Sequence, residues 1–158
     1  LNNEKEIDEH HKVVRLLSDD LQKVATNVHT TRFRYVDVIK KSTGDLLQTS
    51  SEIVGELPAN WQEHLGDLLA AMLPAGSIAG APKEKSVAVI DEAETYERGF
   101  YTGIAGVFDG KTLDSFVLIR FIERIGDRYF YKSGAGITAQ SKPLNEYNEI
   151  IEKIYIPI

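Results

Sequence analysis

The sequence contains no cysteine, which limits both its chemistry and the ways in which it can be stabilised. Disulfide bonds and thiolate nucleophiles are excluded, and a zinc ion would find only histidine and carboxylate ligands. Long apolar runs are also missing, because the most apolar window, residues 65–82, contains Asp67 and two prolines and falls short of the ~20 apolar residues that span a bilayer. We therefore expect a soluble, cytoplasmic protein without a membrane partner.

An excess of positive charge is absent as well. The chain has 18 lysines and arginines against 24 aspartates and glutamates, which gives a formal net charge of −6 at pH 7. This balance is the reverse of the basic surface that a phosphate backbone selects. We therefore expect no nucleic-acid partner.

The remaining composition is that of an ordinary globular protein. Apolar residues make up 42% of the 158 positions and charged residues 27%, which predicts one folded domain. The chain opens at Leu1 inside a helical pattern, without the basic flank and apolar stretch of a signal or transit peptide. Because the only methionine is Met72, we expect the chain to be part of a longer polypeptide.

Hydrophobic periodicity and turn residues predict helices that flank groups of hairpins. The predicted helices cover residues 4–25, 61–72, 82–94 and 143–155. The predicted strands cover residues 32–40, 46–57, 100–108, 114–123, 128–132 and 136–140. Turn sequences at residues 42–45, 109–110 and 126–127 predict a hairpin followed by an antiparallel meander. Hairpins between helices, without regular βαβ alternation, predict an α+β fold.

Two pairs of glutamates are candidates for a metal site. Glu6 and Glu9 lie three residues apart on the first predicted helix, and Glu146 and Glu149 lie three apart on the last. This spacing puts both carboxylates of a pair on one helix face. Two facing pairs would offer the hard oxygen ligands that Mg²⁺ prefers. The same spacing recurs elsewhere in the chain, so it describes a solvated charged face equally well.

Two glycine-containing segments are candidates for anion binding. Residues 76–83 lead into a predicted helix N-terminus, where free backbone amides can hold an anion. The segment lacks the Gly-Lys-Ser/Thr sequence of a phosphate-binding loop. It can equally be a loop whose small residues allow tight packing. Residues 134–139 match the letters of a dinucleotide fingerprint, but no second parallel strand can follow. Their backbone amides can bind a carboxylate, or they can form a turn or bulge.

Arg120 is the third anion-binding candidate. It follows three apolar residues in the strand predicted over 114–123. A guanidinium on a buried strand needs an anion, which would be a ligand or a carboxylate within the protein.

These features form an ordered set along the chain. Its members are residues 4–10, 73–83, 90–92, 100–103, 119–120, 134–137 and 146–149. The set resembles the C-terminal part of the chorismate-utilising enzymes, a family that includes component I of aminodeoxychorismate synthase and of anthranilate synthase. Residues 46–53, 77–78 and 155–158 most resemble the aminodeoxychorismate branch, which makes the precursor of para-aminobenzoate and folate.

The resemblance implies a role for each candidate residue. The implied Mg²⁺ ligands are Glu9 and Glu149, with Glu6 and Glu146 beside them to complete the shell. Tyr101 and Arg120 would bind the pyruvyl carboxylate of chorismate, with the backbone amides of Gly134, Ala135 and Gly136 beside it. The Ser77 hydroxyl would lie near the ring carboxylate. Gln48 would also contact the substrate, at a position where many anthranilate synthases carry a histidine. Residues 14–20 depart from the family pattern, so the polar contacts of that helix are not implied.

The resemblance also implies a fold and a reaction. Residues 1–158 would be the C-terminal portion of a single chorismate-binding domain of layered antiparallel sheets and helices, whose N-terminal half is absent from this chain. The full enzyme would aminate chorismate to 4-amino-4-deoxychorismate with ammonia from a glutamine amidotransferase subunit. The general-acid glutamate and nucleophilic lysine would lie upstream, so we expect this chain alone to be inactive. The alternatives are anthranilate synthase component I, an isochorismate-type synthase and a non-catalytic, degenerate ligand-binding domain.

Overall fold

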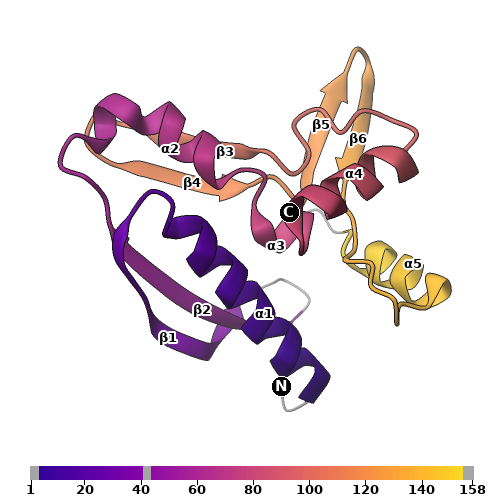
Figure 1. Ribbon diagram of the computed structural model, residues 1–158. Helices are drawn as coiled ribbons and strands as arrows, with labels where there is room; N and C mark the ends of the chain where they lie inside the picture. Colours follow the sequence, from indigo (N-terminus) through magenta and orange to yellow (C-terminus); the bar gives the residue numbers. More distant parts are fainter. Residues whose placement is uncertain (1–3, 41–43, 155–158) are drawn as a thin grey trace. The chain divides into compact units, whose positions relative to one another are not determined.

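The computed structural model describes residues 4–40 and 44–154, apart from the side chains of residues 4–6 and 46. The chain divides into two compact units, Leu1–Thr95 and Tyr96–Ile158 (Figure 1). Both units combine helices with two-stranded antiparallel sheets. The α+β class predicted from the sequence is therefore confirmed.

The first unit consists of one long hairpin and several helices. Its elements are α1 (Glu4–Leu21), β1 (Thr26–Ile39), β2 (Leu46–Glu56), the 3₁₀ helix η1 (Trp61–His64), α2 (Leu65–Met72), α3 (Gly76–Ala79) and α4 (Lys83–Ala93). The helices predicted over 4–25, 61–72 and 82–94 and the first hairpin are all present, while residues 42 and 43 of the turn predicted over 42–45 lie outside the described residues. From the sequence we expect residues 74–81, a run of small residues, to form a loop; this is wrong in part, because residues 76–79 form the single helical turn of α3.

Helix α1 lies along the β1–β2 hairpin (Figure 1). Gly55 on β2 leaves room for the end of α1 and for the start of β1, because a Cβ atom there would lie 3.4 Å from Leu21 Cδ2 and 2.9 Å from Val28 Cγ2. Near the other end of the helix, a hydrogen bond of 2.7 Å joins His10 Nε2 to Ser51 Oγ on β2. The helix is thus fixed to the hairpin at both ends.

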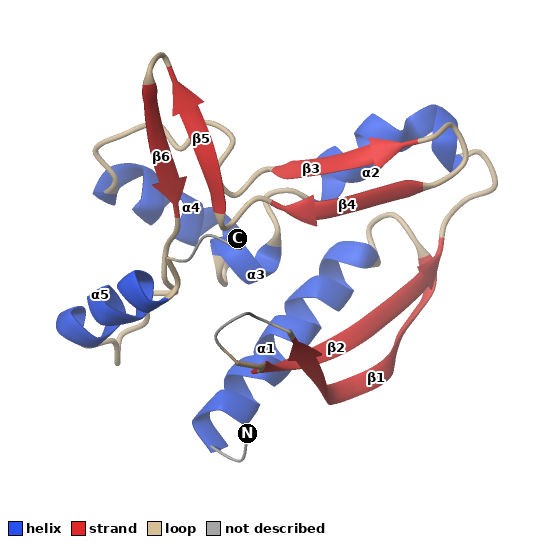
Figure 2. Cartoon of the chain, turned by 180° about the vertical axis from the view of Figure 1, so that it is seen from behind, coloured by secondary structure: helices blue, strands red, loops and turns tan. Residues whose placement is uncertain are grey.

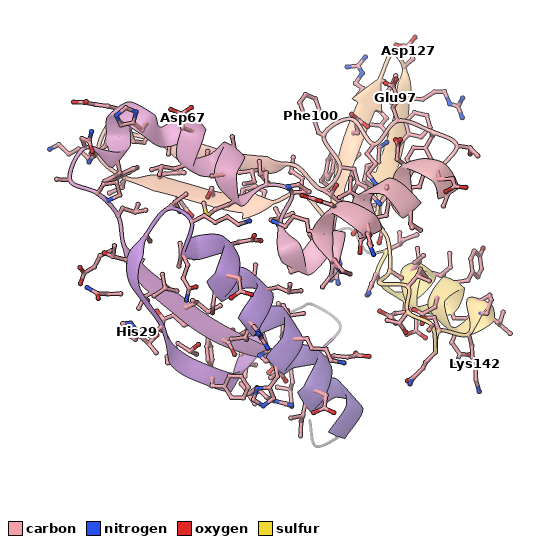
Figure 3. All side chains as sticks on the ribbon, in the orientation of Figure 1. His29, Asp67, Glu97, Phe100, Asp127 and Lys142 are labelled. Carbon is pink, nitrogen blue, oxygen red and sulfur yellow. The ribbon has the colours of Figure 1, made fainter. Side chains whose placement is uncertain are left out.

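The second unit contains two hairpins and a helix. Its elements are β3 (Ile104–Phe108), β4 (Leu113–Val117), β5 (Phe121–Ile125), β6 (Arg128–Lys132) and α5 (Pro143–Glu152). Strand β3 pairs with β4 and β5 with β6, as two separate sheets (Figure 2). The Asp109 carboxylate accepts hydrogen bonds from the amides of Lys111 and Thr112 and closes the first hairpin as an Asx-type turn, while Asp127 lies at the tip of the second (Figure 3).

Three strand predictions in this unit are wrong. The strand predicted over 114–123 is split between β4 and β5, because the chain leaves the sheet after Val117, and this split also breaks the predicted meander. The strand predicted over 100–108 starts only at Ile104, since residues 99–103 form turns. Residues 136–140 form no strand and pair with none of the described segments.

Burial is slight throughout the described residues. Ala79, 6% exposed, is their only buried apolar residue, and large apolar side chains such as Val38 and Leu47 on the first hairpin and Phe116 on the second are more than half exposed. Two-stranded hairpins are marginally stable unless their apolar face is covered. Exposed apolar faces of this kind mark surfaces that contact further protein.

None of the described helices is by itself long and apolar enough to cross a membrane. The helices over Trp61–Ala79 and Lys83–Ala93 meet the length and composition criteria only as a pair, which is bent by 68°.

Candidate functional site

Ser77, the first candidate for substrate binding, is exposed on the single helical turn of α3. This turn is closed by a hydrogen bond of 2.9 Å from the Ala79 amide to the Ala75 carbonyl and ends at Gly80, whose φ of 84° lies in the left-handed region. Ala75 occupies the N-cap position and offers no side-chain acceptor to the first amides of the turn. The start of α3 therefore depends on a residue from elsewhere in the chain.

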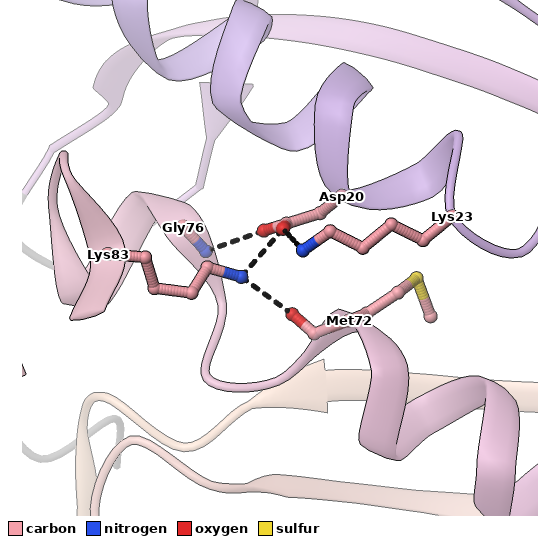
Figure 4. A network of polar contacts seen from close by, with 5 residues as sticks. All are labelled: Asp20, Lys23, Met72, Gly76 and Lys83. Carbon is pink, nitrogen blue, oxygen red and sulfur yellow. Dashed lines mark hydrogen bonds and ion pairs between the residues drawn. The ribbon is translucent and has the colours of Figure 1, made fainter.

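Asp20, at the C-terminal end of α1, supplies the missing acceptor (Figure 4). Its Oδ2 accepts a hydrogen bond of 3.0 Å from the Gly76 amide, and its Oδ1 accepts bonds of 2.6 Å from Lys83 Nζ and 2.7 Å from Lys23 Nζ. Burial alone would raise the pKa of Asp20, but the hydrogen bonds from the two lysines and the Gly76 amide together lower it below its usual value. The carboxylate is therefore ionised at neutral pH, and its contribution to stability is lost only as the pH falls through the lowered pKa.

Lys83 connects this carboxylate to a second helix end. Its Nζ also donates a hydrogen bond of 3.3 Å to the Met72 carbonyl in the last turn of α2. Gly76 is required here, because a Cβ atom would lie 2.9 Å from Asp20 Oδ2 and 3.2 Å from Leu16 Cβ. The ends of α1 and α2 and the starts of α3 and α4 thus meet around one buried carboxylate.

In the second unit, the Tyr101 hydroxyl lies against Gly134. A Cβ atom on Gly134 would overlap this hydroxyl, so the absence of a side chain allows the approach. The Arg98 guanidinium lies 5.6 Å from the centre of the Tyr101 ring, and its NH1 donates a hydrogen bond of 3.2 Å to Thr102 Oγ1. The structure therefore brings together two of the residues predicted to bind one carboxylate.

Thr102 holds the backbone next to Tyr101 in a strained conformation. Its φ of 68° lies in the left-handed region, which β-branched residues rarely adopt. Two backbone hydrogen bonds maintain it, from Thr102 N to Leu118 O at 2.8 Å and from Leu118 N to Gly103 O at 2.9 Å. Such strain persists where the surroundings impose it, often at functional sites.

The segment around Gly134, Ala135 and Gly136 is irregular and directly follows β6. Gly136 is exposed, and a Cβ atom on it would meet no other atom within 4 Å. The Ser133 hydroxyl, which the sequence analysis missed, is buried and has no hydrogen-bond partner in the described part of the chain. A serine before the segment Gly134-Ala135-Gly136 gives no sequence signal that would have identified it.

Arg120 is not on a strand. It lies in the bend between β4 and β5 and is exposed, so its predicted place on a buried strand is wrong. No hydrogen bond or ion pair of its guanidinium is found among the described residues, and the internal carboxylate partner considered for it is therefore not seen. Its guanidinium is accessible to an anion from solution.

The candidate metal ligands are divided between the two units. Glu9 is exposed on α1, while α5 carries the half-buried Glu146 and the exposed Glu149, whose carboxylate accepts a hydrogen bond from Lys153 one turn later. The Glu6 side chain lies outside the described residues. Within those residues, no three His, Asp or Glu side chains form a group that could hold a metal ion.

Gln48 is the remaining candidate. It is exposed on β2, opposite Asp37 of β1. The structure brings it together with no other predicted site residue among those it describes.

Comparison with known proteins identifies the family. A model of the chorismate binding enzymes matches residues 1–158, the whole chain. The chain belongs to the chorismate binding enzyme family. The family resemblance predicted from the ordered motifs is thereby confirmed, and the chain is part of a family of enzymes.

Relatives of this chorismate binding chain come from several branches. It is 53% identical over 158 residues to an uncharacterized PabA-like protein of Haemophilus influenzae, covering 100% of this chain and 48% of the relative. It is 37% identical to anthranilate synthase component 1 of Archaeoglobus fulgidus over 98% of this chain and 36% of the relative. It is 33% identical to aminodeoxychorismate synthase component 1 of Bacillus subtilis over 98% of this chain and 32% of that protein. The chain thus spans about half the length of the PabA-like relatives and about a third of the synthases.

Proposed function

We propose that this chain forms the C-terminal part of an aminodeoxychorismate synthase component I, which aminates chorismate with ammonia to give 4-amino-4-deoxychorismate. The observation that carries chorismate binding is the approach of the Tyr101 hydroxyl to Gly134 in a chain of the chorismate binding family, while the aminodeoxychorismate branch is proposed from the resemblance of residues 46–53, 77–78 and 155–158. These are two of the positions that the family resemblance assigns to one carboxylate of chorismate. The product of this reaction leads to para-aminobenzoate and folate.

The chain carries groups suited to a dicarboxylate substrate. The Tyr101 hydroxyl can donate a hydrogen bond to the pyruvyl carboxylate, and the exposed Arg120 guanidinium can pair with it in a bidentate geometry. The amides around Gly136 add donors without a side chain in the way. On α3 of the first unit, the exposed Ser77 hydroxyl can donate to the ring carboxylate. Each of these groups would replace a hydrogen bond to water that a carboxylate of the substrate loses when it binds.

The glutamates fit magnesium by their chemistry. Glu9, Glu146 and Glu149 offer hard carboxylate oxygens, the ligands that Mg²⁺ prefers. Glu6 would complete the set. When bound, Mg²⁺ would act as a Lewis acid and template on the ring carboxylate while the C4 hydroxyl is lost. The glutamates would hold it through their carboxylate oxygens.

The general acid, the nucleophile and the ammonia come from outside this chain in the proposal. The relatives are two to three times longer than the chain, and the family resemblance assigns the acid glutamate and the nucleophilic lysine to the N-terminal half of the domain. A glutamine amidotransferase subunit would supply ammonia. The exposed apolar faces of the hairpins suit contacts with the N-terminal half.

Product analysis with the full-length gene product tests this function. The protein is incubated with chorismate, ammonium and Mg²⁺, and the products are separated and identified by mass spectrometry. We expect 4-amino-4-deoxychorismate from the full-length protein and no turnover from residues 1–158 alone. Anthranilate or isochorismate as product would move the assignment to another branch of the family. Binding of chorismate without turnover or Mg²⁺ dependence would indicate a degenerate domain.

A further inference from the structure

Asp20 is the only buried charged side chain among the residues that the structure describes, with 6% of its surface exposed. A buried carboxylate is unfavourable unless charged or polar donors surround it. Its three donors are the Gly76 amide at the start of α3, Lys83 at the start of α4, and Lys23 in the turn that follows α1. The Asp20 carboxylate thus joins the end of α1 to two segments that lie 56 and 63 residues further along the chain.

Helix α3 depends on this junction for its position. A helical segment of four residues has no stability of its own, because each such turn must be nucleated at a cost. Its own N-cap, Ala75, cannot accept a hydrogen bond through its side chain, whereas Asp20 Oδ2 accepts one from the Gly76 amide. Asp20 therefore acts as an N-terminal cap supplied by another helix.

Lys83 fixes the other end of the same loop. It is the first residue of α4, and its Nζ bonds both Asp20 Oδ1 and the carbonyl of Met72, the last residue of α2. The loop over residues 73–82 is therefore held to the Asp20 carboxylate through Gly76 and Lys83, and Lys83 also holds Met72 at the start of the loop (Figure 4). Ser77, one residue after Gly76, moves with the start of α3.

We propose that Asp20 is a positioning residue, which sets the place of the Ser77 hydroxyl through the Gly76 amide and so raises the affinity for chorismate without touching it. This inference rests on the proposed function of Ser77. The charged network gives α1, which carries Glu9, and α3, which carries Ser77, a fixed relation within one unit. Displacement of a binding group by a fraction of an ångström weakens the bond that it makes.

A double-mutant cycle in the full-length protein tests the proposal. In Asp20→Asn, the amide nitrogen must face either the Gly76 amide or the lysines, all of which are donors, so one contact is lost. We expect the KM for chorismate to rise about tenfold with kcat within about twofold. In a Ser77→Ala background, the same change should alter KM less than about twofold. Asp19→Asn, an exposed neighbour on α1, is the matched control and should leave KM unchanged.

Hydrogen exchange of the ligand-free protein gives a second readout that does not depend on activity. In Asp20→Asn, the amides of α3 should exchange about tenfold faster, while those in the middle of α1 should not change. If Asp20→Asn does not fold, Lys83→Met replaces it in both measurements. It removes one of the donors that hold the Asp20 carboxylate next to the Gly76 amide, so we expect changes in the same direction and of smaller size.

The outcomes separate the two proposals. A KM effect of equal size with and without Ser77, or unchanged exchange in α3, would overturn the positioning role. Faster exchange in a protein that does not convert chorismate would support the junction at Asp20 but contradict the proposed function.

Discussion

Replacing Glu149 by glutamine is expected to reduce turnover of chorismate by the full-length protein about 10³-fold at saturating chorismate. The substitution keeps the size of the side chain on α5 but removes the negative charge, and a neutral amide is a poor ligand for Mg²⁺. The Lys153 ammonium, which bonds Glu149 in this structure, would lose the negative charge that now compensates its own. The measurement is the initial rate as a function of Mg²⁺ concentration.

The same helix offers a matched control. Glu152 lies three residues further along α5 and is exposed, so Glu152→Gln removes the same charge from the same helix. We expect this variant to keep its rate within about twofold, as exposed charge changes usually do. If Glu149→Gln and Glu152→Gln lower the rate equally, or if the Mg²⁺ dependence is unchanged, the assignment of Glu149 as a metal ligand is contradicted.

The second large effect is expected from Arg120→Ala. Truncation of a guanidinium that pairs with a desolvated carboxylate lowers kcat/KM by about 10²-fold or more. Arg120→Lys should recover only part of this loss, because an ammonium keeps the charge but not the two parallel hydrogen bonds. The measurement is kcat/KM for chorismate in the three proteins.

Arg124→Ala is the control for this prediction. Arg124 is also exposed, four residues along the chain on β5, but its guanidinium is engaged locally, with the Gly126 carbonyl at 2.8 Å and Asp127 at 3.6 Å. Its removal should leave kcat/KM within about twofold. Equal losses in Arg120→Ala and Arg124→Ala would show that general surface charge, and not a specific contact, attracts the substrate.

Local signals predicted several elements correctly. The spacing of apolar residues located α1, and the Asp109-Gly110 turn located the β3–β4 hairpin, because both depend on neighbours within a few residues. The split between β4 and β5 was missed, since the apolar run before Arg120 continues a strand pattern through the bend. That run does not indicate where strand pairing ends, because pairing depends on the partner strand as well.

The contacts that build the site were beyond local patterns. Asp20 was not predicted as a functional residue, because its donors Gly76 and Lys83 are distant in sequence and only folding brings them to it. The approach of Tyr101 to Gly134 likewise joins residues on either side of two hairpins. Family resemblance singled out the last two residues, but their contact is visible only in three dimensions.

The central claim is that this chain holds a carboxylate of chorismate between Tyr101, Arg120 and the amides around Gly134. A crystal structure of the full-length protein with chorismate and Mg²⁺ tests it most directly. We predict a carboxylate of the ligand within about 3 Å of the Tyr101 hydroxyl and of at least one amide in residues 134–136, with the Arg120 guanidinium paired to it. Chorismate bound without contact to any of these groups would contradict the account.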